Sequence, residues 1–526
     1  MAQGYLAFVL HAHLPFVRHP EYDHFLEERW LFEAINETYL PLLRSWRRLA
    51  DEGVPFQVTL SLSPSLLAML EDPLLQWRFV DHLDRLIELC GRERDRLRGE
   101  PHFAWLAEYY EKLFREHRAE FTACDGRLAL AFRDLHRRGV VELATCAATH
   151  GLLPLLASQP KAVEAQLATG LDYFEQVLGF RARGFWLPEC GYYPGVEDRL
   201  RRHGVRYFFT ESVGVENADA APAYGVHAPL YTNAGVAAFA RDQAITKEVW
   251  SADAGFPGDP DYREFYHDIG HDLPWDYIRP HLPGDVRCDT GIKYFRITGK
   301  TPWKQPYQPE AAREKAARHA AQFVFKRVAH VDYLKTVMQT APLITAPFDA
   351  ELFGHWWFEG PQWLDYVMRK AAYDQHSFEL TTPSAYLDRH PVHQRATPAC
   401  STWGRGGYFD YWLNGQTDWI FAQVKECGAR MEALAGRHGS GEPPPRVRRA
   451  LNQCVRELLL AQASDWPFII SGGTAAQYAA RRVKDHVSRF HALADALDGG
   501  AVDDAVLGAL EYLDNPFPNA DYRIFS

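Results

Sequence analysis

Two histidines separated by one residue form the first group in the chain that could do chemistry. His11 and His13 directly follow an apolar run, Tyr5–Leu10. Because alternate side chains of a strand point the same way, both imidazoles can enter one pocket. One interpretation is ligation of zinc or iron, with help from distant His or Asp residues. The other is hydrogen bonding of a polar substrate by the imidazoles.

Two carboxylic acids also follow short apolar runs. Glu189 comes just after Gly184–Leu187 and stands among aromatic and sulfur side chains, which favours a shifted pKa. Asp349 comes after Leu343–Ala346, and Glu351 could cap or orient it. In glycoside cleavage one carboxylate attacks or stabilises the sugar cation, while the other donates and then removes a proton. This pair therefore favours a glycosidase.

Tryptophan is the third chemical signal, since the chain has 15 of them and several lie in polar or Gly-rich surroundings. Flat aromatic faces beside hydrogen-bonding groups suit sugar rings. The alternative for each tryptophan is simple burial in the core. The tryptophans in such surroundings are found in His355-Trp356-Trp357, Trp403-Gly404-Arg405, Tyr411-Trp412 and Asp465-Trp466.

Short apolar runs separated by helical patterns must position these groups. Strand–helix alternation predicts an α/β barrel, in which the carboxyl ends of the strands meet at the active-site face. His11, Glu189 and Asp349 would then converge, because each follows such a run. The predicted strands are Tyr5–Leu10, Phe56–Leu60, Val141–Thr145, Gly184–Leu187, Tyr207–Thr210, Ile292–Ile297 and Leu343–Ala346.

Three stretches depart from this alternation. Residues 64–135 contain only helical patterns and are predicted to be a helical insertion within a barrel spanning 1–396. Residues 215–290 are rich in Gly, Pro and Asp, and loops of that length are usually functional. Residues 397–526 are predicted to form a C-terminal helical domain that completes the substrate cleft, with a linker at 439–445.

Composition excludes several classes of protein. The 526 residues carry 57 Lys and Arg against 68 Asp and Glu, a net charge of −11, so a nucleic-acid partner is not expected. No apolar run reaches the roughly 18 residues of a membrane helix, and the N-terminus lacks the charged start of a signal peptide. Eight cysteines without a Cys-x-x-Cys pair give no disulfide scaffold or zinc ribbon. We expect a soluble cytoplasmic protein.

Taken together, these motifs resemble those of glycoside hydrolase family 57. The length, the Tyr262–Tyr266 stretch and the helical C-terminal part are most similar to the 1,4-α-glucan branching enzymes of that family. Five segments carry the resemblance, in chain order from near the N-terminus to the helical region. They are His11–Phe16, Ala144–Gly151, Trp186–Cys190, Phe348–Trp357 and Cys400–Asn414.

The resemblance implies a (β/α)7 barrel with a helical insertion and a C-terminal all-helical domain. It implies a retaining mechanism without metal or other cofactor, in which Glu189 is the nucleophile and Asp349 the general acid/base. The implied substrate is an α-glucan such as amylose, amylopectin or a glycogen-like polymer. The implied substrate-binding residues are His11, His13, His150, Trp275, His355, Trp356, Trp357, Trp403, Trp412, Asp465 and Trp466.

In the implied reaction, an α-1,4 chain is transferred to Glu189 and then to a 6-hydroxyl, which creates an α-1,6 branch. Attack by water gives hydrolysis instead, so branching requires a closed site. The resemblance also implies a tyrosine on a flexible loop within 232–266. Tyr231, Tyr262 and Tyr266 are the candidates, while Phe256 lacks a hydroxyl. Without that tyrosine we expect more hydrolysis.

Three other functions remain open from the sequence. An α-amylase or 4-α-glucanotransferase of the same family would differ only in its product linkage. A metal-dependent deacetylase or amidohydrolase would use His11, His13 and His150, although it would not need many tryptophans. A catalytically inactive glucan-binding protein is the third, since fold and residues do not guarantee activity.

Overall fold

A curled, mainly parallel sheet is the centre of the structure, a computed structural model that describes residues 4–251, 254–439 and 441–526. Parts of the predicted loop and linker, residues 252–253 and 440, lie outside the described residues, as does the N-terminal tripeptide. The strands run in the order β6-β7-β5-β4-β3-β2-β1-β8, with β9 paired to β1. Their bounds are β1 (Gly4–Ala12), β2 (Val58–Leu62), β3 (Val141–Cys146), β4 (Gly184–Trp186), β5 (Tyr207–Thr210), β6 (Leu230–Tyr231), β7 (Ala237–Ala240), β8 (Leu343–Asp349) and β9 (Phe378–Leu380).

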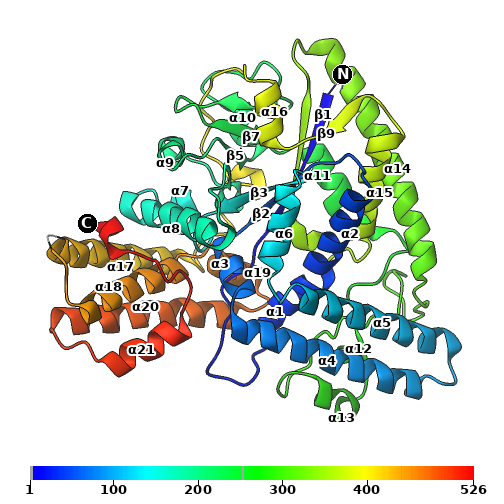
Figure 1. The fold of residues 1–526 in the computed structure, drawn as a ribbon, viewed down its shortest axis with the longest axis horizontal. Helices are drawn as coiled ribbons and strands as arrows, with labels where there is room; N and C mark the ends of the chain where they lie inside the picture. Colours follow the sequence, from blue (N-terminus) through cyan, green and yellow to red (C-terminus); the bar gives the residue numbers. More distant parts are fainter. Residues whose placement is uncertain (1–3, 252–253, 440) are drawn as a thin grey trace.

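Seven neighbouring strands, from β7 to β8 in this order, are parallel, as in a (β/α)7 barrel. All nine residues of β1 are buried, because helices cover both faces of the sheet. Figure 1 shows β1 running from the N-terminus at the top toward the centre of the molecule. A backbone hydrogen bond of 3.0 Å from Asp242 N–H to Thr345 O connects the end of β7 to β8.

One predicted strand is wrong, and three observed strands, β6, β7 and β9, were missed. Ile292–Ile297 is irregular and contributes only isolated bridges, among them Arg263 to Arg296. Of the missed strands, β7 belongs to the parallel barrel. It has three alanines in four residues and therefore little intrinsic β preference. β7 forms because all of its residues pair with β5 in parallel register. The stretch 215–290, predicted as one long loop, thus contains two strands and short helices.

Helices lie between the strands and pack against the sheet. Residues 28–51 and 160–178 are helical, and the first stretch contains a π-helical segment, η1. The helices of this part are α1 (Glu28–Glu33), η1 (Ala34–Tyr39), α2 (Leu40–Asp51), α7 (Leu153–Leu156), α8 (Pro160–Leu178), α9 (Val196–Arg202), α10 (Ser212–Glu216), α11 (Gln243–Trp250), α12 (Ile269–Asp272), α13 (Trp275–Ile278), α14 (Pro309–Val337), α15 (Gly360–Tyr373) and α16 (Pro383–Arg389).

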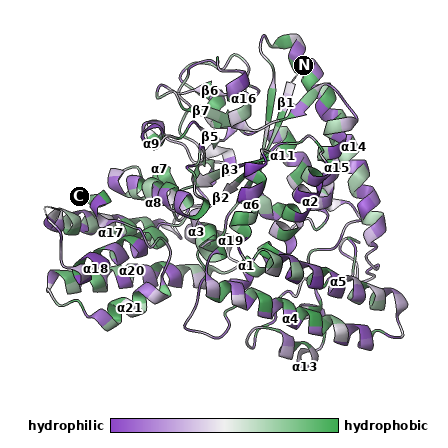
Figure 2. Ribbon diagram, viewed as in Figure 1, coloured by the Kyte–Doolittle hydropathy of each residue, from purple (hydrophilic) through white to green (hydrophobic). Residues whose placement is uncertain are grey.

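Residues 64–137 are helical, as the sequence predicts. Figure 1 shows α4 and α5 as a long pair on the lower right of the molecule. Hydrophobic and hydrophilic residues alternate around these helices in Figure 2, as expected for helices that bury one side. The helices are α3 (Pro64–Leu70), α4 (Pro73–Arg96), α5 (Pro101–Ala123) and α6 (Leu128–Arg137).

The C-terminal part is also helical and reaches back to the strand ends. Figure 1 shows α17, α18, α20 and α21 as a separate group at the lower left. Between α18 and α19 the chain returns to the barrel, where Ala463 forms a bridge with Gly151 after β3. These helices are α17 (Asp418–His438), α18 (Pro445–Ala461), α19 (Asp465–Gly472), α20 (Ala476–Asp498) and α21 (Asp504–Leu513).

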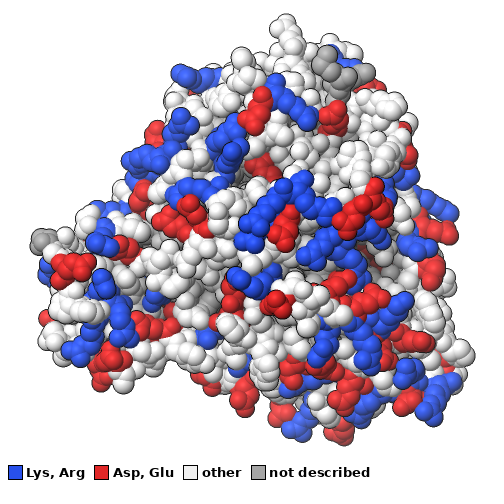
Figure 3. Space-filling model, in the orientation of Figure 1, with Lys and Arg blue, Asp and Glu red and all other residues white. Residues whose placement is uncertain are grey.

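The surface carries both signs of charge. Figure 3 shows Lys and Arg interspersed with Asp and Glu over the face in view, which is not the single-sign field that nucleic-acid binding favours. Among the described residues, no helix combines the length and apolarity needed to cross a membrane.

Candidate active site

The carboxyl ends of three neighbouring strands bring the first predicted residues together. In the parallel register, His11 of β1 lies opposite Asp349 at the end of β8 and opposite Ser61 of β2. Glu189 follows β4 in a short 3-10 turn, Pro188–Cys190. The fold therefore confirms that these groups share one end of the barrel, as expected for parallel strands.

The backbone at Glu189 is strained. Glu189 has φ of 59° and Cys190 of 49°, both in the left-handed region that non-glycine residues rarely adopt. His150 has the same conformation, with φ of 59°. Each such residue costs on the order of 1–3 kcal/mol and persists only where surrounding contacts enforce it. The contacts around these three residues therefore over-determine their backbone conformation.

The Glu189 carboxylate accepts a hydrogen bond on each oxygen. The Trp403 indole Nε1 donates to Oε2 at 2.8 Å, and the Ser464 hydroxyl donates to Oε1 at 2.7 Å. Burial raises the pKa of Glu189 to about 7, while the Ser464 and Trp403 hydrogen bonds oppose that rise. Both bonds favour the charged form of Glu189, so they keep its pKa below the value that burial alone would give.

Asp349 is more exposed than Glu189. Desolvation and the nearby Glu189 charge raise its pKa, although the side chain is exposed in the bare protein. A bound chain that covers Asp349 would complete the desolvation and favour its protonated form further. The two acids titrate as a pair. When the pair holds one proton, the two hydrogen bonds to Glu189 favour the negative charge on Glu189.

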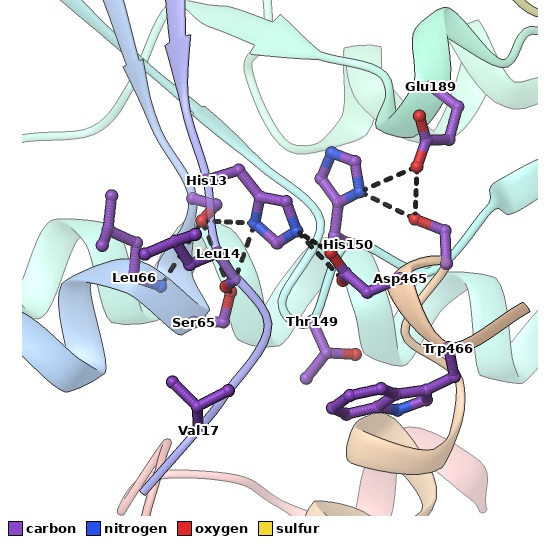
Figure 4. A network of polar contacts seen from close by, with 12 residues as sticks. His13, Leu14, Val17, Ser65, Leu66, Thr149, His150, Glu189, Asp465 and Trp466 are labelled. Carbon is purple, nitrogen blue, oxygen red and sulfur yellow. Dashed lines mark hydrogen bonds and ion pairs between the residues drawn. The ribbon is translucent and has the colours of Figure 1, made fainter. Parts of the chain in front are cut away.

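Three histidines form the wall beside Glu189, and His13, His150 and Asp465 are labelled in Figure 4. His13 binds Ser63 Oγ at 2.8 Å through Nδ1 and Asp465 Oδ2 at 3.0 Å through Nε2. Its ring stacks on that of His150, with centroids 3.8 Å apart. Burial lowers the pKa of His13, but the charge and hydrogen bond of Asp465 outweigh it and raise the pKa overall. The carboxylates of Asp465 and Glu189 therefore both favour the protonated form of His13.

The ring nitrogens of His11 and His150 are also engaged within the protein. His11 binds Ser61 Oγ at 3.1 Å and His150 Nε2 at 3.0 Å. His150 binds Ser464 Oγ at 2.8 Å through Nδ1. The donor atoms of His13, His150 and Asp465 lie within 4.8 Å of one another. A metal ion there would have to break these hydrogen bonds, so the donor set fits a hydrogen-bonded scaffold better than a metal site.

Several residues of this site were missed from the sequence. The π-helical segment η1 carries Glu37 and Tyr39, which reach the motif after β8. Glu37 Oε2 binds His355 Nδ1 at 2.7 Å, and the Tyr39 hydroxyl donates to Glu351. Within an amphipathic helix these two residues had no distinguishing pattern. Ser464 could have been noticed, because it immediately precedes the Asp465-Trp466 pair.

Gly354 is required for this contact between η1 and the motif. It has φ of 121°, and a Cβ there would lie 1.8 Å from the Glu37 carbonyl oxygen. We expect Gly354→Ala to lower the free energy of unfolding by about 2–4 kcal/mol, from strain and backbone overlap. Urea denaturation measures this. Gly415→Ala, at a position with open space around it, is the control and should change stability by less than about 1 kcal/mol.

The predicted tryptophans fall into three groups. Trp403 is partly buried beside Glu189, and Trp356 is 58% exposed with its ring stacked on Phe265, centroids 4.6 Å apart. Trp275 lies in α13, which Figure 1 shows at the opposite end of the molecule from β9 and the start of β1. The third group is packed in the core and presents no face to a bound glucan in this structure. It consists of Trp357, Trp412 and Trp466.

Trp403 is partly buried and donates directly to Glu189. We expect Trp403→Phe, which keeps a flat ring but lacks the indole N–H, to lower kcat about 10-fold with little change in KM on amylose. Trp403→Ala should in addition raise KM for long chains, because the ring face is lost. Steady-state kinetics on amylose measures both. Equal KM for both variants and wild type would show that the ring does not contact the glucan.

The tyrosine candidates within 231–266 have different surroundings. Tyr262 is buried, and its hydroxyl is 2.8 Å from His319 Nδ1. Phe256 is buried against the same imidazole. Tyr231 is half-buried in β6, whereas Tyr266 is 79% exposed and contacts Phe265 edge-on. Of the three tyrosines, Tyr266 is the most exposed, so it fits the predicted loop tyrosine best.

Comparisons with known proteins agree with this geometry. The model of glycosyl hydrolase family 57 matches residues 7–397, and that of the C-terminal part of 1,4-alpha-glucan branching enzymes matches 423–525. The 1,4-alpha-glucan branching enzyme of Thermococcus kodakarensis is 35% identical, over 98% of this chain and 77% of its own length. A probable 1,4-alpha-glucan branching enzyme of Mycobacterium tuberculosis is 30% identical, over 95% and 94%.

Solved structures give the same grouping. The alpha-amylase AmyC of Thermotoga maritima superimposes with a TM-score of 0.93 at 42% identity, covering 99% of both chains. The branching enzyme of Pyrococcus horikoshii gives 0.89 at 32% identity, covering 99% of this chain and 97% of that one. The family match, the parallel barrel and the paired acids agree: the chain belongs to glycoside hydrolase family 57.

Proposed function

We propose that the protein is a retaining 1,4-α-glucan branching enzyme. The observation that carries the proposal is the pair of acids in unequal environments. Two hydrogen bonds favour the charged form of Glu189, whereas the pKa of the nearby Asp349 is raised by desolvation and by the charge of Glu189. The C-terminal family match and the branching-enzyme relatives support transfer rather than hydrolysis.

The geometry supports a two-step reaction. Asp349 protonates the glycosidic oxygen of an α-1,4 linkage, while the Glu189 carboxylate attacks the anomeric carbon and forms a glycosyl–enzyme bond. Asp349, now a carboxylate, removes the proton from the 6-hydroxyl of a second glucan. That oxygen displaces Glu189 and forms an α-1,6 linkage. The two inversions give overall retention.

The barrel of residues 1–396 and the helical region of 397–526 would share the substrate. Trp403 and Ser464 come from the helical region and contact Glu189 directly. Asp465 from the same region contacts His13 of the barrel. We place the enzyme in cytoplasmic synthesis of a glycogen-like glucan, where branching of linear chains is the relevant reaction.

One observation favours a second candidate, an α-amylase. AmyC of Thermotoga maritima, which is 42% identical to this chain, is described as an alpha-amylase. Both activities share the first step and differ in whether water or a 6-hydroxyl attacks the glycosyl–enzyme. The outcome depends on the exclusion of water from the intermediate.

Incubation with amylose distinguishes the two functions. New α-1,6 linkages and new reducing ends are counted in the same sample. The proposal predicts branches well in excess of reducing ends. Reducing ends without branches would make the protein an amylase, while leaving Glu189 and Asp349 in their roles.

A further inference from the structure

Glu189 lies at the end of a continuous chain of buried hydrogen bonds. From Ser61 Oγ the chain passes to His11 at 3.1 Å and from His11 Nε2 to His150 Nε2 at 3.0 Å. It continues from His150 Nδ1 to Ser464 Oγ at 2.8 Å and ends at Glu189 Oε1 at 2.7 Å. Figure 4 shows His150 and Glu189 both joined by dashed lines to this hydroxyl oxygen. All of these side chains are buried.

The ionised state of Glu189 fixes the direction of every bond in the chain. A carboxylate can only accept, so Ser464 must use its hydroxyl proton as the donor and accept from His150 Nδ1–H. Burial lowers the pKa of both His150 and His11, so each imidazole is neutral and carries one proton. His150 Nε2 then accepts from His11 Nε2–H, and His11 Nδ1 accepts from the Ser61 hydroxyl. Each hydroxyl or N–H proton that these four bonds use then has one acceptor within the chain.

The Ser464 hydroxyl is fixed in place from several sides. The Ser464 side chain is buried, and its backbone N–H donates to the carbonyl oxygen of His150 at 3.2 Å. The preceding residue, Ala463, forms a bridge with Gly151. On the other side, the carbonyl oxygen of Ser464 accepts from Phe468 N–H at 3.2 Å, within the first turn of α19. These contacts therefore hold the Ser464 hydroxyl in a fixed position beside Glu189.

We propose that Ser464 is a positioning residue that, oriented by His150, aims the Glu189 carboxylate and keeps it ionised for attack. Through Ser464 the C-terminal helical region contributes to the first chemical step. His11 and His150 keep the Ser464 hydroxyl oriented through their hydrogen bonds. The inference rests on the proposed function only in taking Glu189 as the nucleophile. It holds whether water or a glucan hydroxyl later receives the chain.

The test isolates glycosyl–enzyme formation with 4-nitrophenyl α-maltooligosaccharides, whose cleavage does not depend on the acceptor. For Ser464→Ala we expect kcat to fall about 10- to 100-fold, with KM changed less than about twofold. Because the carboxylate loses a hydrogen bond, its pKa rises, and the acidic limb of the pH profile moves up by about 1–2 pH units. A loss of packing alone would lower activity without moving this limb.

Ser464→Thr and Ser471→Ala complete the test. Ser464→Thr keeps the hydroxyl and should restore the wild-type acidic limb, even where its extra methyl group lowers kcat. Ser471, in the helix α19 that Ser464 precedes, accepts a hydrogen bond from Asn414 at 2.9 Å, and Ser471→Ala should leave the pH profile unchanged. An acidic limb of Ser464→Ala identical to wild type would overturn the inference. Failure of the branching function would appear separately, as a wild type that cleaves the reagent but makes no α-1,6 linkages.

Discussion

Glu189→Gln is expected to lower the rate of glycosyl transfer by about 10⁴-fold or more, with the fold intact. The amide has nearly the shape of the carboxylate and can still accept from Ser464 or Trp403, so packing around the strained turn is preserved. It lacks the negative charge needed to attack the anomeric carbon. Initial rates on amylose and thermal unfolding of the same samples measure the two properties.

Glu164→Gln is the matched control for this variant. Glu164 is bonded to Arg199 and His203 away from the strand ends, so its substitution should leave the rate unchanged. Azide added to Glu189→Gly sharpens the assignment. With an activated α-donor, azide in the vacated space attacks in place of the carboxylate and gives a β-glycosyl azide. A near-wild-type rate for Glu189→Gln would remove Glu189 as the nucleophile.

Asp349→Asn is expected to lower kcat/KM on amylose by about 10²–10⁴-fold, because the sugar leaving group then departs without a proton. α-Maltosyl fluoride needs no such proton. The variant should therefore still form the glycosyl–enzyme with the fluoride at a rate close to wild type. The ratio of the two rates, measured as new α-1,6 linkages on amylose and as the first-turnover burst of fluoride, identifies a general acid.

Asp388→Asn controls for a change of charge, since Asp388 is exposed and pairs with Arg206. The wild-type pH profile gives the sign of the Asp349 contribution. The pKa of Asp349 is raised, and the acid must be protonated to act, so activity on amylose is lost as pH rises through that pKa. Equal losses on amylose and on the fluoride would contradict the assignment of Asp349 as acid/base.

The positions of His11, Glu189 and Asp349 could be predicted because each follows a buried run, and parallel strands place their carboxyl ends together. β7 could not be predicted, since its alanines pair only in the presence of β5. Ile292–Ile297 had a strand pattern but no neighbouring edge to pair with over its length. In both cases the tertiary environment outweighed the local preference.

The partners of the site residues were harder to predict than the residues themselves. Tyr39 reaches Glu351, and Ser464 reaches Glu189, across 312 and 275 residues of chain. No local pattern records such contacts. The burial of Trp412 and Trp466 was equally hidden, because a tryptophan in polar sequence can still pack inside the protein.

Trapping the glycosyl–enzyme is the most direct test of the central claim. Asp349→Asn incubated with α-maltosyl fluoride should accumulate the intermediate, since its breakdown lacks the general base. Proteolysis and tandem mass spectrometry then locate the added maltosyl group. A maltosyl ester on Glu189 is the predicted result. An ester on Glu351 or Asp465, with Glu189 unmodified, would contradict the account.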